Sequence, residues 1–116
     1  MTTYERGDVV LVPFPFTDQS STKKRPAAVI SSNNHNKSFS DIVIIAVTSQ
    51  IRRRGSEECL IADWRSAGLL KPSAVKPVIS SIETRLVLRK LGRLSPEDCA
   101  AADDLLRELL NLPLSS

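Results

Sequence analysis

A run of six apolar residues, 42–47, constrains the fold of this chain more than any other feature. The run is far shorter than the roughly 20 apolar residues that a membrane span needs. It is rich in Ile and Val, which favour strands. A strand that is apolar at every position has both faces covered, so it belongs in the middle of a sheet. We expect this central strand to span residues 41–49.

Other segments fit short strands separated by turn residues. Further strands are expected at 7–13, 26–31, 57–62 and 74–81, with a helical turn after Glu83 and then an edge strand through 92–94. Polar loops are expected at 17–24 and 31–38, a basic turn at 51–56 and a loop at 63–73. Pro13 and Pro15 are expected to interrupt strand pairing, because proline cannot donate to the ladder.

One helix is predicted at the C-terminus. Ser95 is a good N-cap, Pro96 suits the first helical position, and Asp98 adds negative charge to the first turn. An apolar stripe with helical spacing follows, formed by Cys99, Ala102, Leu106, Leu109 and Leu110. We expect the stripe to pack on the core, with a partner groove as the alternative. The prediction is therefore a mostly β protein with a C-terminal helix, in a single domain over residues 1–116.

The charge of the chain is unevenly distributed. The net charge is +3, and the basic residues concentrate in 20–54 and 71–93, whereas the predicted helix is acidic. This pattern suits either a polyanion-binding surface on one side or a balanced soluble surface. With no membrane span and no apolar signal sequence, a cytoplasmic location is expected. Cys59 and Cys99 are expected to be reduced structural thiols, with a disulfide or redox role as the alternative.

Three cations precede the second predicted strand: Lys23, Lys24 and Arg25, followed by Pro26. Proline disfavours a helical conformation at the preceding residue, so Arg25 is expected to be extended. Its guanidinium is always charged and offers a rigid fork of donors, which suits a phosphate. The alternative is a solvated loop tip.

Five segments in order resemble the MazF/PemK family of toxin ribonucleases. They are residues 7–18, residues 24–31, the strand ending in Val47-Thr48-Ser49, residues 67–76 and residues 90–95. The resemblance implies a small SH3-like β-barrel of the MazF, CcdB and Kid type with a C-terminal helix. It also implies a homodimeric toxin endoribonuclease of a type II toxin–antitoxin system, which cleaves single-stranded RNA and is neutralised by a cognate antitoxin. No cofactor and no metal are expected.

RNA cleavage without a metal can use the ribose 2′-OH as an internal nucleophile. The protein must then stabilise charge on the phosphoryl oxygens and move two protons. Together with the family resemblance, this chemistry makes Arg25 and Thr48 the candidate catalytic residues. The candidate RNA-binding residues are Asp18, Lys23, Lys24, Ser49, Gln50, Arg52, Arg53 and Lys76.

The chain departs from the family pattern at the expected general base. Some members carry Glu five residues before the Arg, where this chain has Ser20, and Asp18 is the nearest carboxylate. Others pair Arg with Asp on the strand that here contains Lys76, and no Asp lies beside it. The only histidine, His35, is expected to be a solvated loop residue, so a two-histidine mechanism is excluded and a zinc site is unsupported. The base stays open.

Two alternatives to the ribonuclease remain. One is a non-enzymatic gyrase-inhibitor toxin of the same fold, and the other is a catalytically inactive RNA-binding barrel. Arg25 and Thr48 favour the ribonuclease, because a gyrase inhibitor needs neither. Aromatic residues are few, so RNA is expected in a groove between protomers rather than on a wide stacking platform.

Overall fold

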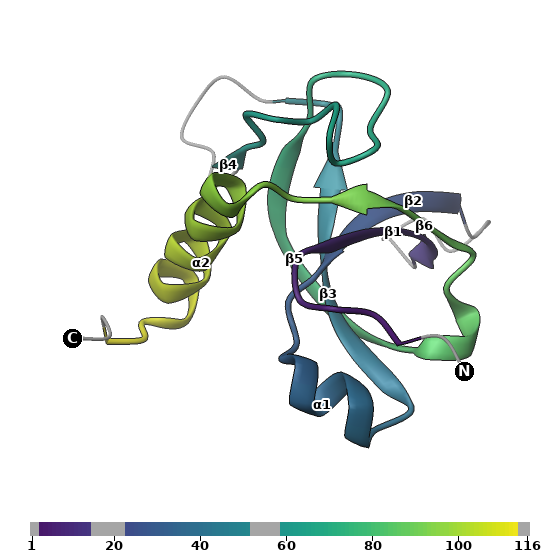
Figure 1. Cartoon of the computed structure of the whole chain (residues 1–116). Helices are drawn as coiled ribbons and strands as arrows, with labels where there is room; N and C mark the ends of the chain where they lie inside the picture. The colour runs from purple at the N-terminus through teal and green to yellow at the C-terminus, as the bar shows by residue number, and fades with distance from the viewer. Residues whose placement is uncertain (1–2, 15–22, 52–58, 114–116) are drawn as a thin grey trace.

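The computed structural model describes residues 3–14, 23–51 and 59–113. One antiparallel sheet of six strands carries the fold, in the order β4-β5-β3-β2-β1-β6. The elements are β1 (Asp8–Phe14), β2 (Lys23–Val29), α1 (Asn33–Ser38), β3 (Asp41–Thr48), β4 (Cys59–Leu60), β5 (Ala74–Glu83), the 3₁₀ turn η1 (Thr84–Leu86), β6 (Arg89–Arg93) and α2 (Pro96–Leu110). The sheet curls strongly, and α2 lies against it on one side (Figure 1).

The expected central strand is β3, which pairs with β2 on one side and β5 on the other. Alternate residues of β3 point into different apolar clusters, as the two-residue period of a strand requires. Ile45 and Val47 join a cluster that includes Leu106 of α2. Ile42 and Ile44 join a second cluster that includes Tyr4. Both faces of β3 are therefore buried, which explains its continuous apolar sequence.

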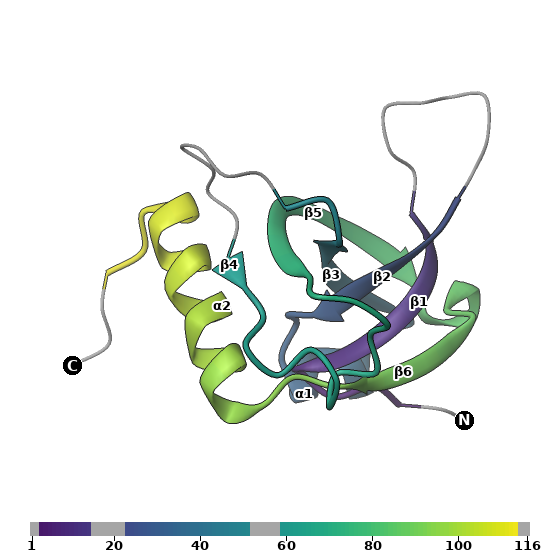
Figure 2. The same cartoon turned by 90° about the horizontal axis from the view of Figure 1, so that it is seen from above.

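The segment between β4 and β5 crosses to the opposite edge of the curled sheet and covers it (Figure 2). The Arg93 N–H donates to the Ser66 carbonyl at 3.4 Å. Two glycines permit the close approach. A Cβ on Gly68 would lie 2.0 Å from the Leu91 carbonyl oxygen, and one on Gly92 would lie 2.5 Å from the Ala67 carbonyl carbon. Gly68 also has φ of +79°, which side chains disfavour. The 61–73 segment thus closes the barrel.

The boundaries of β2 and β1 differ from the prediction. β2 begins at Lys23, so the three cations lie inside the strand rather than in a preceding loop. Pairing with β1 extends this far because Pro13 opposes Lys24, and Phe14 opposes Lys23. Pro13 does not interrupt β1. Within the described residues the ladder between β1 and β6 ends at Leu11, so no strand pairs with Pro13 on that side. Pro15 lies outside the described residues.

The polar loop expected at 31–38 is wrong, because most of it forms α1. Ser32 caps the helix by accepting a hydrogen bond from the His35 N–H. Asn36 is buried, and its amide donates to the Tyr4 and Ser31 carbonyls at 3.0 and 3.2 Å. His35 is correspondingly not a solvated loop residue: it is half-buried, stacks on Phe39 and lies 3.2 Å from an Asp41 carboxylate oxygen. Capping and tertiary partners outweighed the loop-like composition.

The remaining elements follow the prediction closely. β5 extends two residues further than expected, to Glu83, and a bulge in its pairing with β3 accommodates Pro77. The helical turn and edge strand expected after Glu83 are η1 and β6. The described part of the expected strand at 57–62 contains β4 only at Cys59–Leu60. The basic turn at 51–56 lies largely outside the described residues.

Helix α2 begins as predicted. The Ser95 hydroxyl oxygen accepts from the Asp98 N–H, with Pro96 in the first turn. Asp98 is buried, and its carboxylate accepts from the Ala62 and Asp63 N–H groups at 2.8 and 2.9 Å. It thereby fixes the 61–73 segment to α2. In the described chain, no helix has the length and apolar character needed to cross a membrane.

The apolar stripe of α2 is shorter than predicted. Cys99 and Leu106 pack on the core as expected, joined by Leu105, and Ala102 is buried. Leu109 and Leu110 do not, since their side chains are 38% and 53% exposed. The helix ends immediately afterwards at Asn111, a C-cap in the left-handed conformation with φ of 55°. The last turn therefore lies past the edge of the core.

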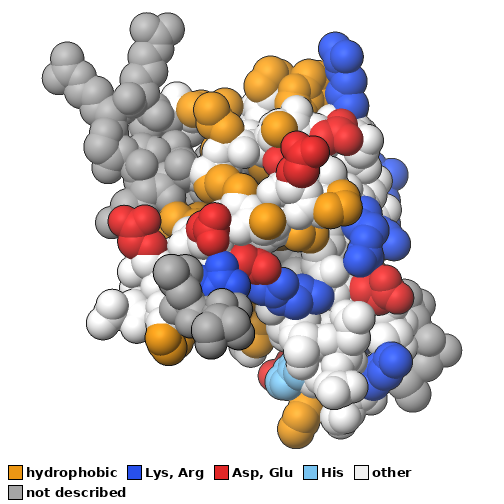
Figure 3. Space-filling view, turned by 60° about the vertical axis from the view of Figure 1, so that its left-hand side comes forward, with side chains coloured by type: hydrophobic (Ala, Val, Ile, Leu, Met, Phe, Trp, Pro, Cys, Tyr) orange, Lys and Arg blue, Asp and Glu red, His pale blue; other side chains and the backbone are white. Residues whose placement is uncertain are grey.

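Ion pairs tie the N-terminal segment to β6 and α2. Asp8 is 2% exposed and lies 2.9 Å from Arg93 and 3.3 Å from Lys90. Arg6 pairs with Asp103 of α2 at 2.5 Å and donates to the Ile30 carbonyl. Figure 3 shows acidic and basic side chains next to one another on the side of the molecule that it displays. These cations serve the fold, because each neutralises a carboxylate.

Candidate nucleic-acid interface

A groove of about 310 Å³ lies at the end of the sheet where β2 begins and β3 ends. Strands β1, β2, β3 and β6 form its floor and sides, and the 61–73 segment forms a wall. The lining residues are Leu11, Lys24, Arg25, Pro26, Val47, Thr48, Ser49, Gly68, Leu69, Leu70, Lys71, Ser73, Arg89 and Leu91. Leucines make up much of this lining, and the charged residues of its described part are all basic.

Arg25 and Thr48 line this groove from neighbouring strands. The ladder between β2 and β3 runs from Val29–Ile44 to Ala27–Ala46. The ladder is antiparallel. Arg25 is two residues before Ala27 and Thr48 is two residues after Ala46, so the same register places Arg25 at the level of Thr48. Arg25 is half-buried, which holds its stem while leaving part of the side chain accessible. The fold thus brings together the two residues that the sequence predicted to be catalytic.

A backbone N–H two residues further along the chain orients the Thr48 hydroxyl. Its oxygen accepts a hydrogen bond from the Gln50 N–H at 3.0 Å. A hydroxyl has one proton and two lone pairs, so this contact leaves the proton available to a second group. Accepting a hydrogen bond also polarises the O–H bond and strengthens its donation. Thr48 can therefore donate to an anionic oxygen in the groove.

Three further cations in the groove, Lys24, Lys71 and Arg89, are exposed. None forms an ion pair with any residue of the described ranges. Most other arginines of the described chain are neutralised: Arg6, Arg85, Arg93 and Arg107 pair with carboxylates. The groove therefore concentrates positive charge that the fold does not use, which suits a polyanion.

The predicted binding residues divide into three groups. Lys24 and Ser49 line the groove with Arg25 and Thr48, whereas Lys23, Gln50 and Lys76 do not. Lys76 lies in the bulged part of β5, between the Val47–Val75 and Ile45–Ile79 pairs. Asp18, Arg52 and Arg53 lie outside the described residues, so these predictions stay untested. The side chain of Phe14 and all of Phe16 also lie outside the description.

Sequence reasoning missed Leu70, Lys71 and Arg89. Arg89 reaches the groove because it opposes Leu11 on β1, and Leu11 opposes Pro26 on β2. Leu70 and Lys71 arrive with the 61–73 segment, whose path depends on the contact of Gly68 with Leu91. The sequence signal for that path was Gly68 itself, but its partner strand cannot be read from local sequence.

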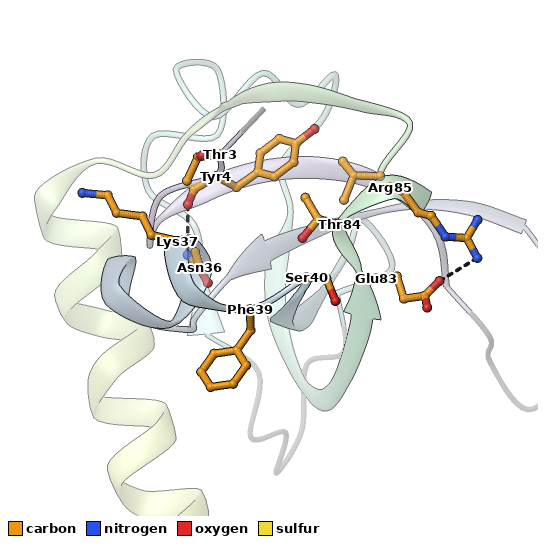
Figure 4. A pocket seen from close by; sticks show the side chains of 10 residues that line it. Thr3, Tyr4, Asn36, Lys37, Phe39, Ser40, Glu83, Thr84 and Arg85 are labelled. Atoms are coloured by element: carbon orange, nitrogen blue, oxygen red, sulfur yellow. Dashed lines mark hydrogen bonds and ion pairs between the residues drawn. The ribbon is translucent and has the colours of Figure 1, made fainter. Parts of the chain in front are cut away.

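A second cavity, of about 520 Å³, lies near the start of β3. Its side chains are shown in Figure 4; Glu83 and Arg85 form an ion pair there at 2.7 Å, and Asn36 bonds to the Tyr4 carbonyl. It shares no lining residue with the groove. Arg85 of this cavity is thus paired with a carboxylate, in contrast to Lys24, Lys71 and Arg89 of the groove, which have no ion pair within the described ranges.

Cys59 and Cys99 are free thiols that pack beside the core cluster against α2. Burial raises the pKa of Cys59, and the Asp98 and Asp104 carboxylates raise it further. Burial also raises the pKa of Cys99, and Arg93 opposes this effect. Both thiols are therefore weak nucleophiles near neutral pH. Among the described residues, no group of three His, Cys, Asp or Glu side chains is arranged to hold a metal ion.

A small, curled β-barrel with a cationic groove at one end and a single capping helix defines a recognisable class of protein. The chain belongs to the family of PemK-like, MazF-like toxins of type II toxin–antitoxin systems, which its sequence matches over residues 5–110. No curated protein matches the chain significantly.

Solved structures share the fold. An endoribonuclease from a mycobacterial species gives a TM-score of 0.77 at 19% identity, covering 99% of this chain and 98% of that one. A chain of the MazE–MazF crystal structure from Deinococcus radiodurans gives 0.76 at 19% identity, covering 97% and 100%. A mycobacterial endoribonuclease in complex with its cognate antitoxin gives 0.75 at 17% identity, covering 99% and 100%. The predicted small β-barrel with a C-terminal helix is thereby confirmed.

Proposed function

We propose that this toxin is an endoribonuclease that cleaves single-stranded RNA in the groove defined by Arg25 and Thr48. Membership of the MazF-like toxin family supports the proposal, as do the structural neighbours described as endoribonucleases. The observation that carries it is the convergence, in one groove, of Arg25 and Thr48 with three cations that have no ion-pair partner among the described residues. Fold likeness alone would not be enough, because related folds host different functions.

The proposed reaction is transfer of the phosphodiester to the neighbouring ribose 2′-oxygen. The 2′-OH attacks the phosphorus, its proton leaves, and the 5′-oxygen departs with a proton, giving a 2′,3′-cyclic phosphate and a 5′-OH end. Arg25 stabilises the charge that develops on the phosphoryl oxygens, and the Thr48 hydroxyl donates to one of them. Arg25 is not assigned as a general acid, because its pKa is too high.

The general base and acid are left unassigned. No carboxylate or histidine is among the described residues that line the groove. Asp18, the carboxylate that the sequence offered for this role, lies outside the described residues. The proposal therefore rests on charge stabilisation and positioning rather than on an identified proton acceptor.

A cognate antitoxin is proposed as the protein partner, since type II toxins are members of toxin–antitoxin pairs. A disordered acidic segment with apolar anchors would match the groove, where Lys71 and Arg89 lie beside Leu11, Leu69 and Leu91. Such a segment would exclude RNA by occupying the same site. We further propose that the toxin acts as a homodimer in the cytoplasm, where its RNA substrate is found.

The test is incubation of the purified protein with a long single-stranded RNA in the presence of EDTA, followed by analysis of both new ends. Cleavage with a 5′-OH and a 2′,3′-cyclic phosphate, or its 3′-phosphate product, is expected. A 5′-phosphate end or a strict need for added Mg²⁺ would overturn the mechanism. Binding of RNA without any cleavage would favour an inactive RNA-binding barrel, and inhibition of gyrase without RNA binding would favour the alternative toxin class.

A further inference from the structure

Leu70 is the most exposed of the large apolar side chains in the described chain, at 92%. It lies on the wall of the groove, between Leu69, which is buried, and Lys71, which is exposed. A leucine that remains in water forgoes the roughly 1.5–3 kcal/mol that burial of such a side chain provides. Single exposed leucines are common, so exposure alone assigns no role. Its position and its rigid support are the informative features.

The backbone on either side of Leu70 is tied down. Before it, the Gly68 N–H donates to the Arg65 carbonyl at 3.0 Å and the Leu69 N–H donates to the Trp64 carbonyl at 3.1 Å. After it, the Ser73 hydroxyl donates to the Lys71 carbonyl at 2.9 Å.

The base of the segment is fixed as well. The Ile61 N–H donates to the Ser73 carbonyl at 2.9 Å, and the Asp98 carboxylate holds the N–H groups of Ala62 and Asp63. Leu70 is therefore held outward by a folded support rather than by a loose loop. A contact made by Leu70 carries a small ordering cost.

The surroundings of Leu70 define what it can contact. Lys71 and Arg89 line the same groove and form no ion pair within the described ranges, so an anionic ligand is favoured. A nucleic acid strand combines negative phosphates with flat, apolar base faces, and single-stranded RNA exposes those faces. The described lining of the groove contains no aromatic side chain, so its leucines and Pro26 are the available apolar surfaces.

We propose that Leu70 determines cleavage specificity by packing against a base that flanks the scissile phosphate, while Lys71 holds the phosphate next to that base. This inference rests on the proposed function, because it places the base in the groove of Arg25 and Thr48. An apolar contact discriminates bases by shape and stacking surface, not by hydrogen bonds. Leu70 therefore sets a preference among sequences, and Arg25 and Thr48 act at every site.

The experiment compares Leu70→Ser, Leu70→Met and Leu112→Ser. Leu112 is 52% exposed and lies beyond α2, outside the groove, so its variant controls for loss of a surface leucine. Each protein is incubated with one long RNA, and cleavage at all sites is quantified by end mapping. Leu70→Ser is expected to change the ratio between strongly and weakly cut sites by about three- to thirtyfold. Leu70→Met keeps the apolar surface but not its shape, so it should change the ratio less than Leu70→Ser, and Leu112→Ser should keep the wild-type ratio.

A second measurement separates failure of this inference from failure of the proposed function. A randomised pool of 2′-O-methyl RNA, which cannot be cleaved by 2′-OH attack, is bound to each protein and the bound fraction is sequenced. If the wild type cuts no RNA but Leu70→Ser alters the selected sequences, the cleavage proposal falls and the base contact stands. If Leu70→Ser changes neither cut-site ratios nor selected sequences, the inference is overturned. An effect confined to self-association or antitoxin affinity would overturn it too, by making Leu70 a protein contact.

Discussion

The groove and the face that joins the N-terminal segment to α2 use positive charge in opposite ways. On the α2 side, Arg6 and Arg93 neutralise Asp103 and the buried Asp8. In the groove, Lys71 and Arg89 have no carboxylate partner among the described residues. A buried carboxylate is costly without a partner, so the first group is needed by the fold. The second group only repels itself, and a bound polyanion would relieve that repulsion.

This difference separates residues that should affect activity from residues that should affect stability. A substitution in the groove should reduce RNA cleavage or binding while leaving the folded state intact. A substitution at the junction of α2 with the sheet should lower the free energy of unfolding. The predictions below test this separation, beginning with the largest effect.

Arg25→Ala is expected to lower the RNA cleavage rate by about 10²–10³, the usual effect of removing one group that stabilises transition-state charge. Arg85→Ala is the matched control, since Arg85 is exposed and pairs with Glu83 at the other cavity. Single-turnover cleavage in EDTA measures both, with circular dichroism to verify folding. A near-wild-type rate for Arg25→Ala, at the same cut sites, would remove Arg25 from the mechanism.

Asp98→Ala is expected to destabilise the protein by about 2–4 kcal/mol, because it leaves the Ala62 and Asp63 N–H groups without their buried acceptor. Glu97→Ala removes the adjacent carboxylate, which is exposed, and should change stability by less than about 0.5 kcal/mol. Urea denaturation of both variants gives the comparison. Equal midpoints for the two would show that Asp98 does not anchor the 61–73 segment.

Thr48→Val is expected to lower the cleavage rate by roughly 10–10², since it keeps the shape of the side chain but removes the hydroxyl donor. Thr48→Ser keeps the hydroxyl and should retain most of the activity. The ratio of the two rates under single-turnover conditions isolates the hydroxyl from the packing of Thr48. Equal rates for Val and Ser would reduce Thr48 to a strand residue.

Lys24→Ala and Lys71→Ala should each weaken binding of an uncleavable RNA slightly and reduce its salt dependence by about 0.7 in the log–log slope. Arg107→Ala removes the same charge from the chain, but Arg107 pairs with Asp104 on α2. Its slope should stay at the wild-type value. RNA affinity is measured for the three variants across a series of salt concentrations. Identical slopes of log affinity against log salt concentration for all three would mean that RNA does not bind along the groove.

Much of the fold could be predicted because its signals are local. The apolar run in β3 and the Ser95 cap act within a few residues of where they appear in the sequence. The failure at α1 has the opposite cause: Asn36 looks like a loop residue until its distant partner, the Tyr4 carbonyl, is known. The exposure of Leu109 and Leu110 also depends on where the sheet ends, which helical periodicity does not contain.

The site was predictable only where family resemblance or charge marked a residue. Arg25 and Thr48, which the sequence predicted to be catalytic, line one groove, and strand pairing explains their proximity; their roles stay predictions. Lys76 was a candidate RNA-binding residue; it lies in the irregular part of β5 and is not among the described residues that line the groove, so its role stays a prediction. Leu70 had no signal, because an exposed leucine in a turn resembles many others. Its placement emerges only from the packing of the 61–73 segment against β6.

Gly68 contacts Leu91 and Gly92 contacts Ala67, and these contacts determine when the wall of the groove becomes ordered. The wall of the groove is fixed when the barrel closes, so its conformational entropy is lost during folding and not during encounter with a ligand. A strand of RNA would meet a rigid template at this wall. RNA sequences that fit this wall would bind without any ordering of the protein. For other sequences the RNA backbone would have to distort, and that distortion would weaken binding.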